Sequence, residues 1–179
     1  TLAWAQQAGW MWSIPTQTRF GMGYVYSDEF LTPDKAQVEI ETTLGHAIEP
    51  RNDLRFDIGR QRDAWINNCL SLGLSSSFLE PLEATSIHGT IVQMMVFTTF
   101  HLARTVEDRA AYNGFAARQV DDFRDFINLH YVTERRDTPF WRHVAENSIG
   151  AATKARLQQW QNKMPDFADF TPLPGHFAH

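Results

Sequence analysis

The amino-acid sequence predicts an α+β fold, with a strand-rich first half followed by long helices. Three observations lead to this prediction. Short segments within residues 1–80 alternate apolar and polar side chains, which is typical of strands. Residues 85–131 instead repeat apolar side chains every three or four positions, as helices do. The composition of the 179 residues, 43% hydrophobic and 21% charged, is that of a folded globular chain.

Four segments of the first half are predicted to be extended. Residues 10–14 alternate and stop at a proline, which removes the next backbone donor. Residues 19–27 are predicted to form a hairpin whose turn is Gly21-Met22-Gly23. Residues 54–58 alternate again, and residues 65–74 are predicted to be a buried strand.

One helix is predicted within this half, over residues 32–45. Thr32 offers a hydroxyl at the cap position, Pro33 fits the first helical position and Asp34 suits the first turn. Gly45 provides a natural stop.

The second half is predicted to be helical over residues 80–102 and over residues 115–131, the latter helix starting after Asn113-Gly114. A shorter helix is expected at 153–163, followed by an irregular tail after Met164. The apolar positions that predict the packing faces are Ile87, Ile91, Met94, Met95, Thr98 and Leu102 on the first helix, and Val120, Phe123, Ile127 and Tyr131 on the second. An aspartate at position 91 is therefore expected to cost several kcal/mol. No internal domain boundary is evident, so residues 1–179 are treated as one segment.

Charge and cysteine content exclude several classes of function. Sixteen basic and twenty-one acidic residues give a net charge of −5 without a dense basic stretch, which argues against a nucleic-acid or anionic-membrane surface. The single cysteine, Cys69, cannot form an internal disulfide, and a reducing cytoplasm is expected. The apolar runs are too short to span a bilayer. The seven histidines lack the spacing of a zinc site, so no metal centre is predicted.

The segment from Gly73 to His88 is the strongest candidate for a site. Small residues end a strand, the chain turns at Glu80-Pro81, and an apolar helix starts at about Thr85. The first turn of a helix offers N–H groups and a positive dipole end that suit an anion. Glu83 precedes this turn. The acid and the threonine could equally stabilise the helix start without any ligand, and the residues alone leave both interpretations open.

Four stretches of the sequence resemble the flavin-dependent tryptophan halogenases, a branch of the single-component flavin monooxygenase (FAD/NAD(P)-binding) fold. They occur in the same order as in that family and cover about residues 9–143. The stretches are Trp10-Met-Trp-Ser-Ile-Pro15, which matches a WxWxIP box; Arg55-Phe-Asp-Ile-Gly-Arg60 with Trp65-Ile-Asn-Asn-Cys69; the GLSS…FLEPLE block at 73–83; and Asp125-Phe-Ile-Asn-Leu-His-Tyr131 with Asp137-Thr-Pro-Phe-Trp141.

The resemblance implies a reaction in which reduced flavin, oxygen and halide yield hypohalous acid, which then reaches an electron-rich ring through a tunnel. A lysine in the tunnel holds the electrophilic halogen, and a glutamate beside it assists. Glu83 matches that glutamate, with the physical role of accepting a proton or stabilising positive charge. The family's halide-binding N–H groups map to Thr85 and Ser86.

The resemblance also assigns cofactor and substrate contacts. Phe140 and Trp141 match an aromatic pair that clamps indole, and Tyr131 matches a tyrosine of the same pocket. Aromatic pairs can equally anchor a loop, and tryptophans at alternate strand positions can equally be core. The residues implied to bind the cofactor are Trp10, Trp12, Ile14, Pro15, Gly73, Leu74, Ser75, Phe78, Glu80 and Pro81.

Some features depart from the family pattern. Ser77 and Ser86 replace glycines, and Ala84 replaces a frequent serine. The glycine loop that holds the ADP half of FAD is absent, as is a lysine within a matching stretch. The segment therefore resembles the C-terminal part of a halogenase, and alone it is expected neither to hold FAD tightly nor to turn over.

The implied cofactors are FAD, as FADH2, and chloride or bromide. The implied partners are an aromatic small molecule such as tryptophan and a separate flavin reductase, with a homodimer as one assembly and with neither nucleic acid nor membrane. Two alternatives stay open: a flavin-dependent hydroxylase of the same fold, and a non-catalytic binding module that keeps the fold.

Overall fold

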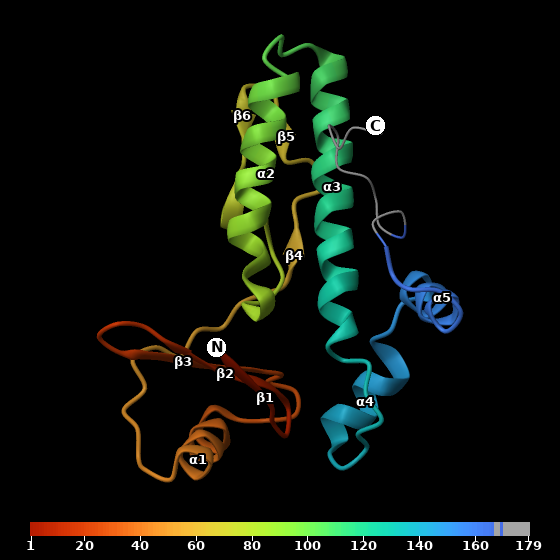
Figure 1. Ribbon diagram of the computed structural model, residues 1–179. Coiled ribbons are helices and arrows are strands. Elements are labelled where there is room, and N and C mark those ends of the chain that lie inside the picture. The colour runs from red at the N-terminus through yellow and green to blue at the C-terminus, as the bar shows by residue number, and fades with distance from the viewer. Residues whose placement is uncertain (167–168, 170–179) are drawn as a thin grey trace. The chain divides into compact units, whose positions relative to one another are not determined.

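The structure is a computed structural model that describes residues 1–166 and residue 169 (Figure 1). Its strands and helices confirm the α+β class. The chain forms two compact units. The first unit comprises Thr1–Phe56 and Tyr131–Ile149, and the second comprises Asp57–His130 and the chain from Gly150 onward.

A three-stranded antiparallel sheet is the centre of the first unit. Its strands, in spatial order, are β1 (Leu2–Ala5), β2 (Gly9–Pro15) and β3 (Phe20–Tyr26). The predicted strand at 10–14 is thus confirmed. The predicted turn at Gly21-Met22-Gly23 is wrong, because these residues lie within β3. The chain reverses earlier, where the Thr16 N–H donates to the Arg19 carbonyl over 2.8 Å.

Gly23 is needed for packing and not for a turn. It lies directly opposite Trp12 in the sheet. A Cβ atom at Gly23 would come within 2.4 Å of Cζ2 of the Trp12 ring. The indole of Trp12 therefore occupies the space that a side chain at position 23 would need.

Replacing Gly23 with alanine should destabilise the fold by about 1–3 kcal/mol, the usual cost of overpacking a site that cannot expand. Gly21→Ala is the matched control on the same strand, because its Cβ atom would lie 3.6 Å from the Ile14 carbonyl oxygen, an ordinary contact. Urea denaturation of both variants measures the difference. Equal stabilities would contradict the inferred role of the Trp12 ring.

Two helices complete the first unit. Helix α1 (Pro33–Leu44) confirms the predicted helix, and Gly45 ends it in a left-handed conformation with φ 76°. Thr32 occupies the cap position without a side-chain hydrogen bond. Helix α4 (Pro139–Asn147) is capped by Thr138, whose hydroxyl accepts a hydrogen bond from the Trp141 N–H. The core of this unit is formed by Ala8, Leu31, Ala36, Phe140, Trp141 and Val144.

The second unit is built on two long helices that lie side by side (Figure 1). These are α2 (Thr85–Phe100) and α3 (Val106–Leu129), and α5 (Ala151–Trp160) corresponds to the short helix predicted near 153–163. Two short antiparallel ladders flank them: β4 (Gly59–Arg60) with β7 (Ser77–Phe78), and β5 (Trp65–Ile66) with β6 (Cys69–Leu70). The core consists of Ala64, Trp65, Val92, Val96, Tyr112, Phe115 and Ala116.

Two predicted strands are wrong. Residues 54–58 are exposed and form no strand. Residues 65–74 form a tight hairpin of β5 and β6 and then a 3₁₀ turn, η1 (Gly73–Ser75). The hairpin forms because Asn67 takes a left-handed conformation, with φ 52°, at the point where the chain reverses. Asparagine is one of the few residues other than glycine that adopt this conformation readily.

The predicted start of the second long helix is also wrong. Helix α3 begins at Val106, because Thr105 and Asp108 form a reciprocal capping box. Asn113 and Gly114 lie inside the helix. The Asn113 side chain bonds to the backbone of Trp65, accepting from its N–H over 2.7 Å and donating to its carbonyl over 3.0 Å. Asn113 therefore joins the hairpin to α3 and does not interrupt the helix.

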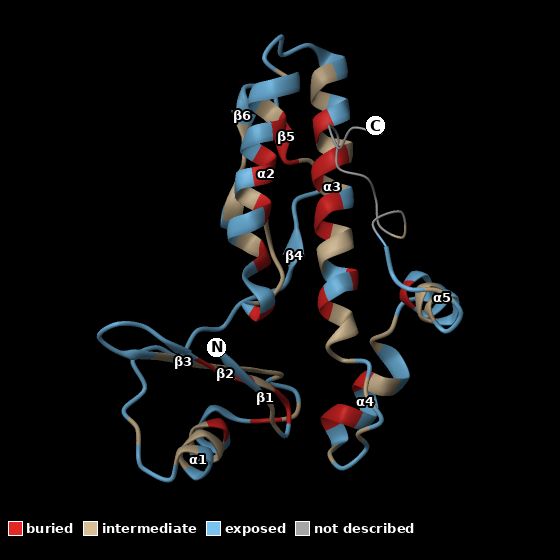
Figure 2. Cartoon of the chain, viewed as in Figure 1, coloured by how far each residue is buried: buried red, intermediate tan, exposed pale blue. Residues whose placement is uncertain are grey.

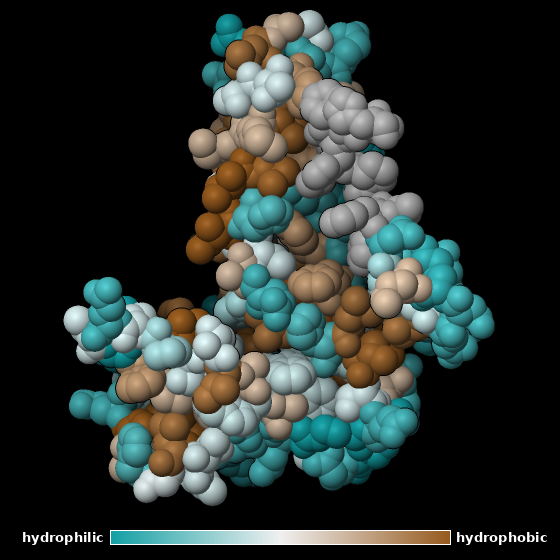
Figure 3. Space-filling view, viewed as in Figure 1, coloured by the Kyte–Doolittle hydropathy of each residue, from teal (hydrophilic) through white to brown (hydrophobic). Residues whose placement is uncertain are grey.

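The predicted packing face of α2 is wrong, whereas that of α3 is confirmed at Val120 and Ile127, which are buried. Figure 2 shows buried positions of α2 between exposed ones, and Figure 3 shows hydrophobic side chains gathered along this helix. Ile91 is 61% exposed and Met94 is 50% exposed. The residues that were predicted to pack are all exposed: Ile87, Ile91, Met94, Met95, Thr98 and Leu102. The residues of α2 that are buried instead are Thr85, Gly89, Val92, Gln93 and Val96.

Close approach of the helices explains this choice of face. A Cβ atom on Gly89 would lie 3.0 Å from the Phe123 ring, so the glycine lets α3 pack tightly against α2. Apolar residues occur on every side of α2, and their periodicity therefore does not select one.

Among residues 1–166 and 169, no helix is long and apolar enough to cross a membrane, and no group of three or more His, Cys, Asp or Glu side chains could hold a metal ion. The predicted irregular tail after Met164 lies mostly outside the described residues.

Candidate active site

A strained loop precedes helix α2 in the second unit. The chain passes through η1, β7 and a second 3₁₀ turn, η2 (Leu82–Ala84), and α2 then starts at Thr85, where the helix entrance was expected. The predicted range of 80–102 is too long, because residues 80–84 precede the helix and α2 ends at Phe100. Glu83 and Ala84 both adopt left-handed backbone conformations, with φ 63° and 51°. Such conformations cost about 1–3 kcal/mol each in residues other than glycine and cluster at functional sites. The loop therefore fixes the direction in which Glu83 leaves the backbone.

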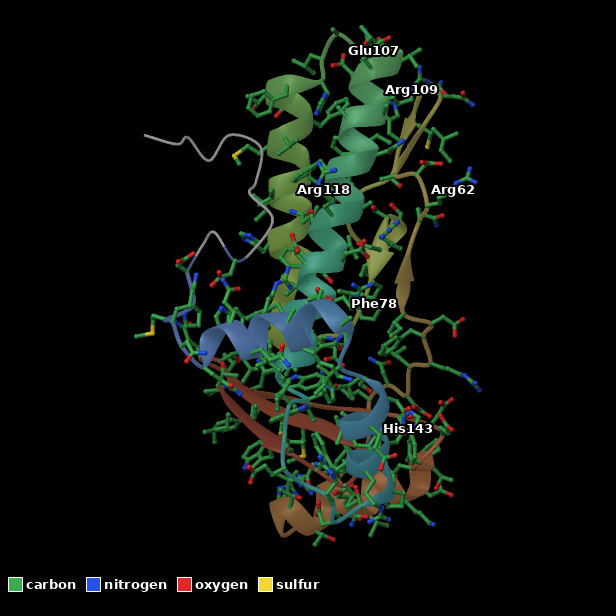
Figure 4. All side chains as sticks on the ribbon, turned by 90° about the vertical axis from the view of Figure 1, so that its right-hand side faces the viewer. Arg62, Phe78, Glu107, Arg109, Arg118 and His143 are labelled. Atoms are coloured by element: carbon green, nitrogen blue, oxygen red, sulfur yellow. The ribbon has the colours of Figure 1, made fainter. Side chains whose placement is uncertain are left out.

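A small pocket lies between this loop and the two long helices. Its volume is about 20 Å³, enough for about one water molecule. Figure 4 shows Phe78 beside the helix pair, toward the end opposite to Glu107 and Arg109. The predicted site residues that line the pocket are Gly73, Phe78, Thr85 and Ser86, and the other lining residues are Ser77, Leu79, Gly89, Thr90, Gln93, Val120 and Phe123.

The start of α2 carries no side-chain cap, because the residue at the cap position is Ala84. Thr85 is the first helical residue and not the cap, so a threonine cap at this helix start is ruled out. Ser86 accepts a hydrogen bond at its carbonyl from the Thr90 hydroxyl over 2.7 Å. N–H groups in the first turn of a helix have no intrahelical acceptor. Those of Thr85 and Ser86 are thus the polar groups of the pocket best suited to an anion.

The helical wall of the pocket includes residues that the sequence analysis missed. Gln93 is buried and donates from Nε2 to Oε1 of Gln119 over 2.9 Å. Gly89 lies one turn before it. Thr85, Gly89 and Gln93 recur every fourth position and therefore share one face of the helix, but polar residues also occur on its other faces, so the sequence alone did not single them out.

Glu83 contacts a residue at the C-terminal end of α3. Its Oε1 atom lies 3.2 Å from Nε2 of His130, and its side chain is 48% exposed. His130 caps the C-terminus of α3, and its Nδ1 atom lies 3.2 Å from the Ile127 carbonyl oxygen. His130 lies within one of the stretches that resemble the family, but the sequence analysis assigned no role to it. Only the fold brings it to Glu83, across 47 positions.

The remaining predicted cofactor residues of this segment lie around the pocket without lining it. Leu74 is 72% exposed. Ser75 and Pro81 are exposed, and Glu80 is half-buried. The structure thus places part of the predicted cofactor residues on the pocket wall, and these four residues are not among those that line it.

The predicted aromatic residues of the first unit form one cluster. The Trp141 ring lies 5.0 Å from that of Phe140, 6.1 Å from Tyr131 and 6.2 Å from Trp10. Trp141 is 1% exposed, and its Nε1 atom donates to the Gln6 carbonyl over 2.7 Å. Trp141 therefore anchors α4 to the sheet. Two further predicted residues, Trp12 and Ile14, share the face of β2 that carries Trp10, and Ile14 and Pro15 are exposed.

A cation completes this cluster. The Arg135 guanidinium lies 4.8 Å from the centre of the Trp141 ring. Arg135 also pairs with Asp137 over 2.8 Å. The hydrogen bond between them raises the pKa of Arg135 and lowers the pKa of Asp137. Both groups therefore stay charged, and the cation–π contact is maintained across the working pH range.

Comparison with known proteins identifies the family. Tryptophan 6-halogenase SttH from Streptomyces toxytricini is 35% identical over 181 residues, which cover 96% of this chain and 34% of the relative. Its crystal structure matches 94% of this chain and 34% of that chain with a TM-score of 0.84. Tryptophan 7-halogenase RebH from Lentzea aerocolonigenes is 37% identical over 174 residues, 92% of this chain and 32% of the relative.

The flavin-dependent halogenase Xcc4156 from Xanthomonas campestris is 38% identical, with a TM-score of 0.79 over 93% of this chain and 36% of that chain. The chain thus spans about a third of the length of the curated relatives it matches. The sequence model of the tryptophan halogenases matches residues 1–177. The chain therefore belongs to the tryptophan halogenase family.

Proposed function

We propose that this chain is the C-terminal, halide- and substrate-side part of a halogenase that uses FADH2, oxygen and chloride or bromide to halogenate tryptophan or another electron-rich aromatic ring. The observation that supports it best is the left-handed loop that presents Glu83 next to the pocket at the start of α2. In a member of the tryptophan halogenase family, this loop is the expected place for both the halide and the acid–base group.

The pocket suits a halide better than a flavin ring. Its volume of about 20 Å³ is far below that of an isoalloxazine, so these residues would form only one wall of a flavin site. Gly73 and Phe78 would contact one edge of the cofactor, where reduced flavin would supply the oxidising chemistry with oxygen. Ser77 also lines this wall, where its side chain would occupy more space than the hydrogen atom of a glycine. The backbone N–H groups of Thr85 and Ser86 would hold the halide.

Glu83 would act on the aromatic substrate. Electrophilic attack by halogen leaves the ring positively charged, and the ring then loses a proton. A carboxylate near the ring stabilises that charge and accepts the proton. In the first unit, Tyr131, Phe140 and Trp141 would contribute to the substrate pocket, and Trp10, Trp12, Ile14 and Pro15 to the environment of the flavin.

The proposal includes a separate flavin reductase that supplies FADH2, and a cytoplasmic location. A homodimer is one form that the complete enzyme could take. No role with nucleic acid is proposed, since the chain carries a net charge of −5.

The test is a turnover assay on a complete halogenase that contains this segment. The enzyme is incubated with FAD, a flavin reductase, NADH, oxygen, L-tryptophan and either chloride or bromide, and products are identified by mass spectrometry. A product with the isotope pattern of chlorine or bromine supports the proposal. A hydroxylated product favours a monooxygenase, and flavin or ligand binding without turnover of any aromatic substrate favours a non-catalytic module.

A further inference from the structure

Helix α2 has an apolar outer face that the described residues leave exposed. The face runs along one side of the helix, at intervals of three or four positions, and consists of Ile87, Ile91, Met94, Met95 and Thr98. Ile87 is 69% exposed and Met95 is 56% exposed. At 1.5 Å per residue the outer face is about 16 Å long, and Figure 3 shows hydrophobic side chains gathered along this helix.

The absence of charge distinguishes α2 from a helix that faces water. The residues of α2 include no Asp, Glu, Lys or Arg. Its neighbour α3 instead carries charged side chains, among them Glu107, Arg109 and Arg118 (Figure 4). A surface helix ordinarily turns a charged face to water, whereas a helix without one is typically buried in a large protein or in a membrane. No helix among the described residues is long and apolar enough to cross a membrane, so burial inside a protein is the interpretation that fits α2.

We propose that the outer face of α2 docks against the part of the complete halogenase that lies outside this segment. This inference rests on the proposed function, in which the chain is one part of a longer enzyme. The segment covers 34% of tryptophan 6-halogenase SttH and 32% of tryptophan 7-halogenase RebH, so about two thirds of such a polypeptide is available to cover the face. The docking surface on that remainder is uncharged and apolar, since a buried charge would lose its water and find no opposite charge on α2.

Docking explains why the sequence pattern and the exposure of α2 disagree. The residues of the outer face follow the period of a buried face, yet α3 packs against the side of α2 that carries Gly89. With the outer face docked, both sides of the helix are buried, as its composition requires. The outer face is also separate from the candidate site, because its residues are not among those that line the pocket. Substitutions on the outer face therefore test docking without altering Glu83 or the pocket.

The first experiment measures the access of hydrogen peroxide to two methionines in a complete halogenase that contains this segment. Peroxide converts methionine to its sulfoxide, and peptide mass spectrometry locates the added oxygen. Met94 and Met95 are the reporters, and Met164, which is 83% exposed, is the control. In the native enzyme we expect the two reporters to be oxidised at least about tenfold more slowly than Met164, because a buried sulfur reacts only after local opening. In urea-unfolded enzyme the three rates should be equal.

The second experiment compares two substitutions in the same complete enzyme. Ile91→Asp should lower the melting temperature by about 4 °C or more, because it buries a charge at the docked face. Val38→Asp is the matched control, since Val38 is equally exposed, at 60%, but lies on α1, which carries charged residues of its own. Its effect should stay below about 2 °C. Ile91→Ala should lower the melting temperature in the same direction by a smaller amount, and it replaces the aspartate variant if that variant does not fold.

Equal oxidation rates for Met94, Met95 and Met164 in the native enzyme would overturn the inference, as would equal melting temperatures of Ile91→Asp and Val38→Asp. Light scattering establishes the oligomeric state during oxidation. Protection that is present in a dimer and lost in the monomer would also overturn the inference, because a second copy would then cover the face.

Neither experiment depends on turnover, so the two proposals can fail separately. Protected methionines in an enzyme that never halogenates would support docking and overturn only the proposed reaction. Exposed methionines in an enzyme that halogenates would overturn only docking.

Discussion

Replacing Glu83 with glutamine in a complete halogenase that contains this segment should lower the rate of halogenation by about a hundredfold, which lies within the usual contribution of a general base. Glutamine keeps the shape of the side chain but can neither accept a proton nor stabilise the positively charged ring. Product formation and flavin affinity are measured on the same preparation, and flavin affinity should stay nearly unchanged because Glu83 does not line the pocket.

Ala84→Ser is the control for this substitution. It lies on the same strained loop and restores the residue that is frequent in the family, so its effect on the rate should be small. If Glu83→Gln were fully active with a lowered melting temperature, Glu83 would be a structural residue of the loop and not a catalytic one.

Val96→Asp in the 179-residue chain should lower the free energy of unfolding by about 3 kcal/mol or more. Val96 is 1% exposed and lies in the core of the second unit, where it packs with Trp65 and Tyr112. The residues that form this core are all apolar or aromatic, so none of them offers a charge to a buried carboxylate. The aspartate would therefore be placed in an apolar environment that disfavours its charge.

Ile91→Asp, on the same helix, is the matched control. Because Ile91 is 61% exposed, its replacement should change stability by no more than about 0.5 kcal/mol. This reverses the expectation drawn from the sequence, which placed Ile91 in the core. Urea denaturation of both variants measures their free energies of unfolding. A larger loss of stability for Ile91→Asp than for Val96→Asp would mean that the packing face predicted from the sequence is the buried one.

Elements with strong local signals were predictable from the sequence. Pro33 and Gly45 bound α1 because their backbone preferences act on the residues next to them. The strand at 10–14 and the start of α2 at Thr85 were found for the same reason. The buried face of α3 was found because its apolar residues are confined to one side.

The errors come from contacts between residues far apart in the sequence. Gly23 resembles a turn residue until the Trp12 ring is placed over it. Asn113 resembles a helix start until its side chain meets the backbone of Trp65. Gly89 would weaken an isolated helix, yet it decides which side of α2 faces α3. No local rule carries this information.

The same distinction between local and long-range information applies to the candidate site. Glu83, Thr85 and Ser86 could be assigned because the resemblance lies in contiguous stretches of sequence. His130 could not be assigned through Glu83, because a histidine and a glutamate 47 positions apart have no detectable relation before the chain folds. The left-handed backbone of Glu83 and Ala84 was equally hidden, since neither residue type favours it.

This backbone has a consequence for protein engineering. A stability-guided redesign would choose glycine at Ala84, whose φ of 51° is strained for alanine and free of strain for glycine. The redesigned loop would also gain freedom and hold Glu83 less firmly. Thermostabilised variants of such an enzyme should therefore leave positions 83 and 84 unchanged.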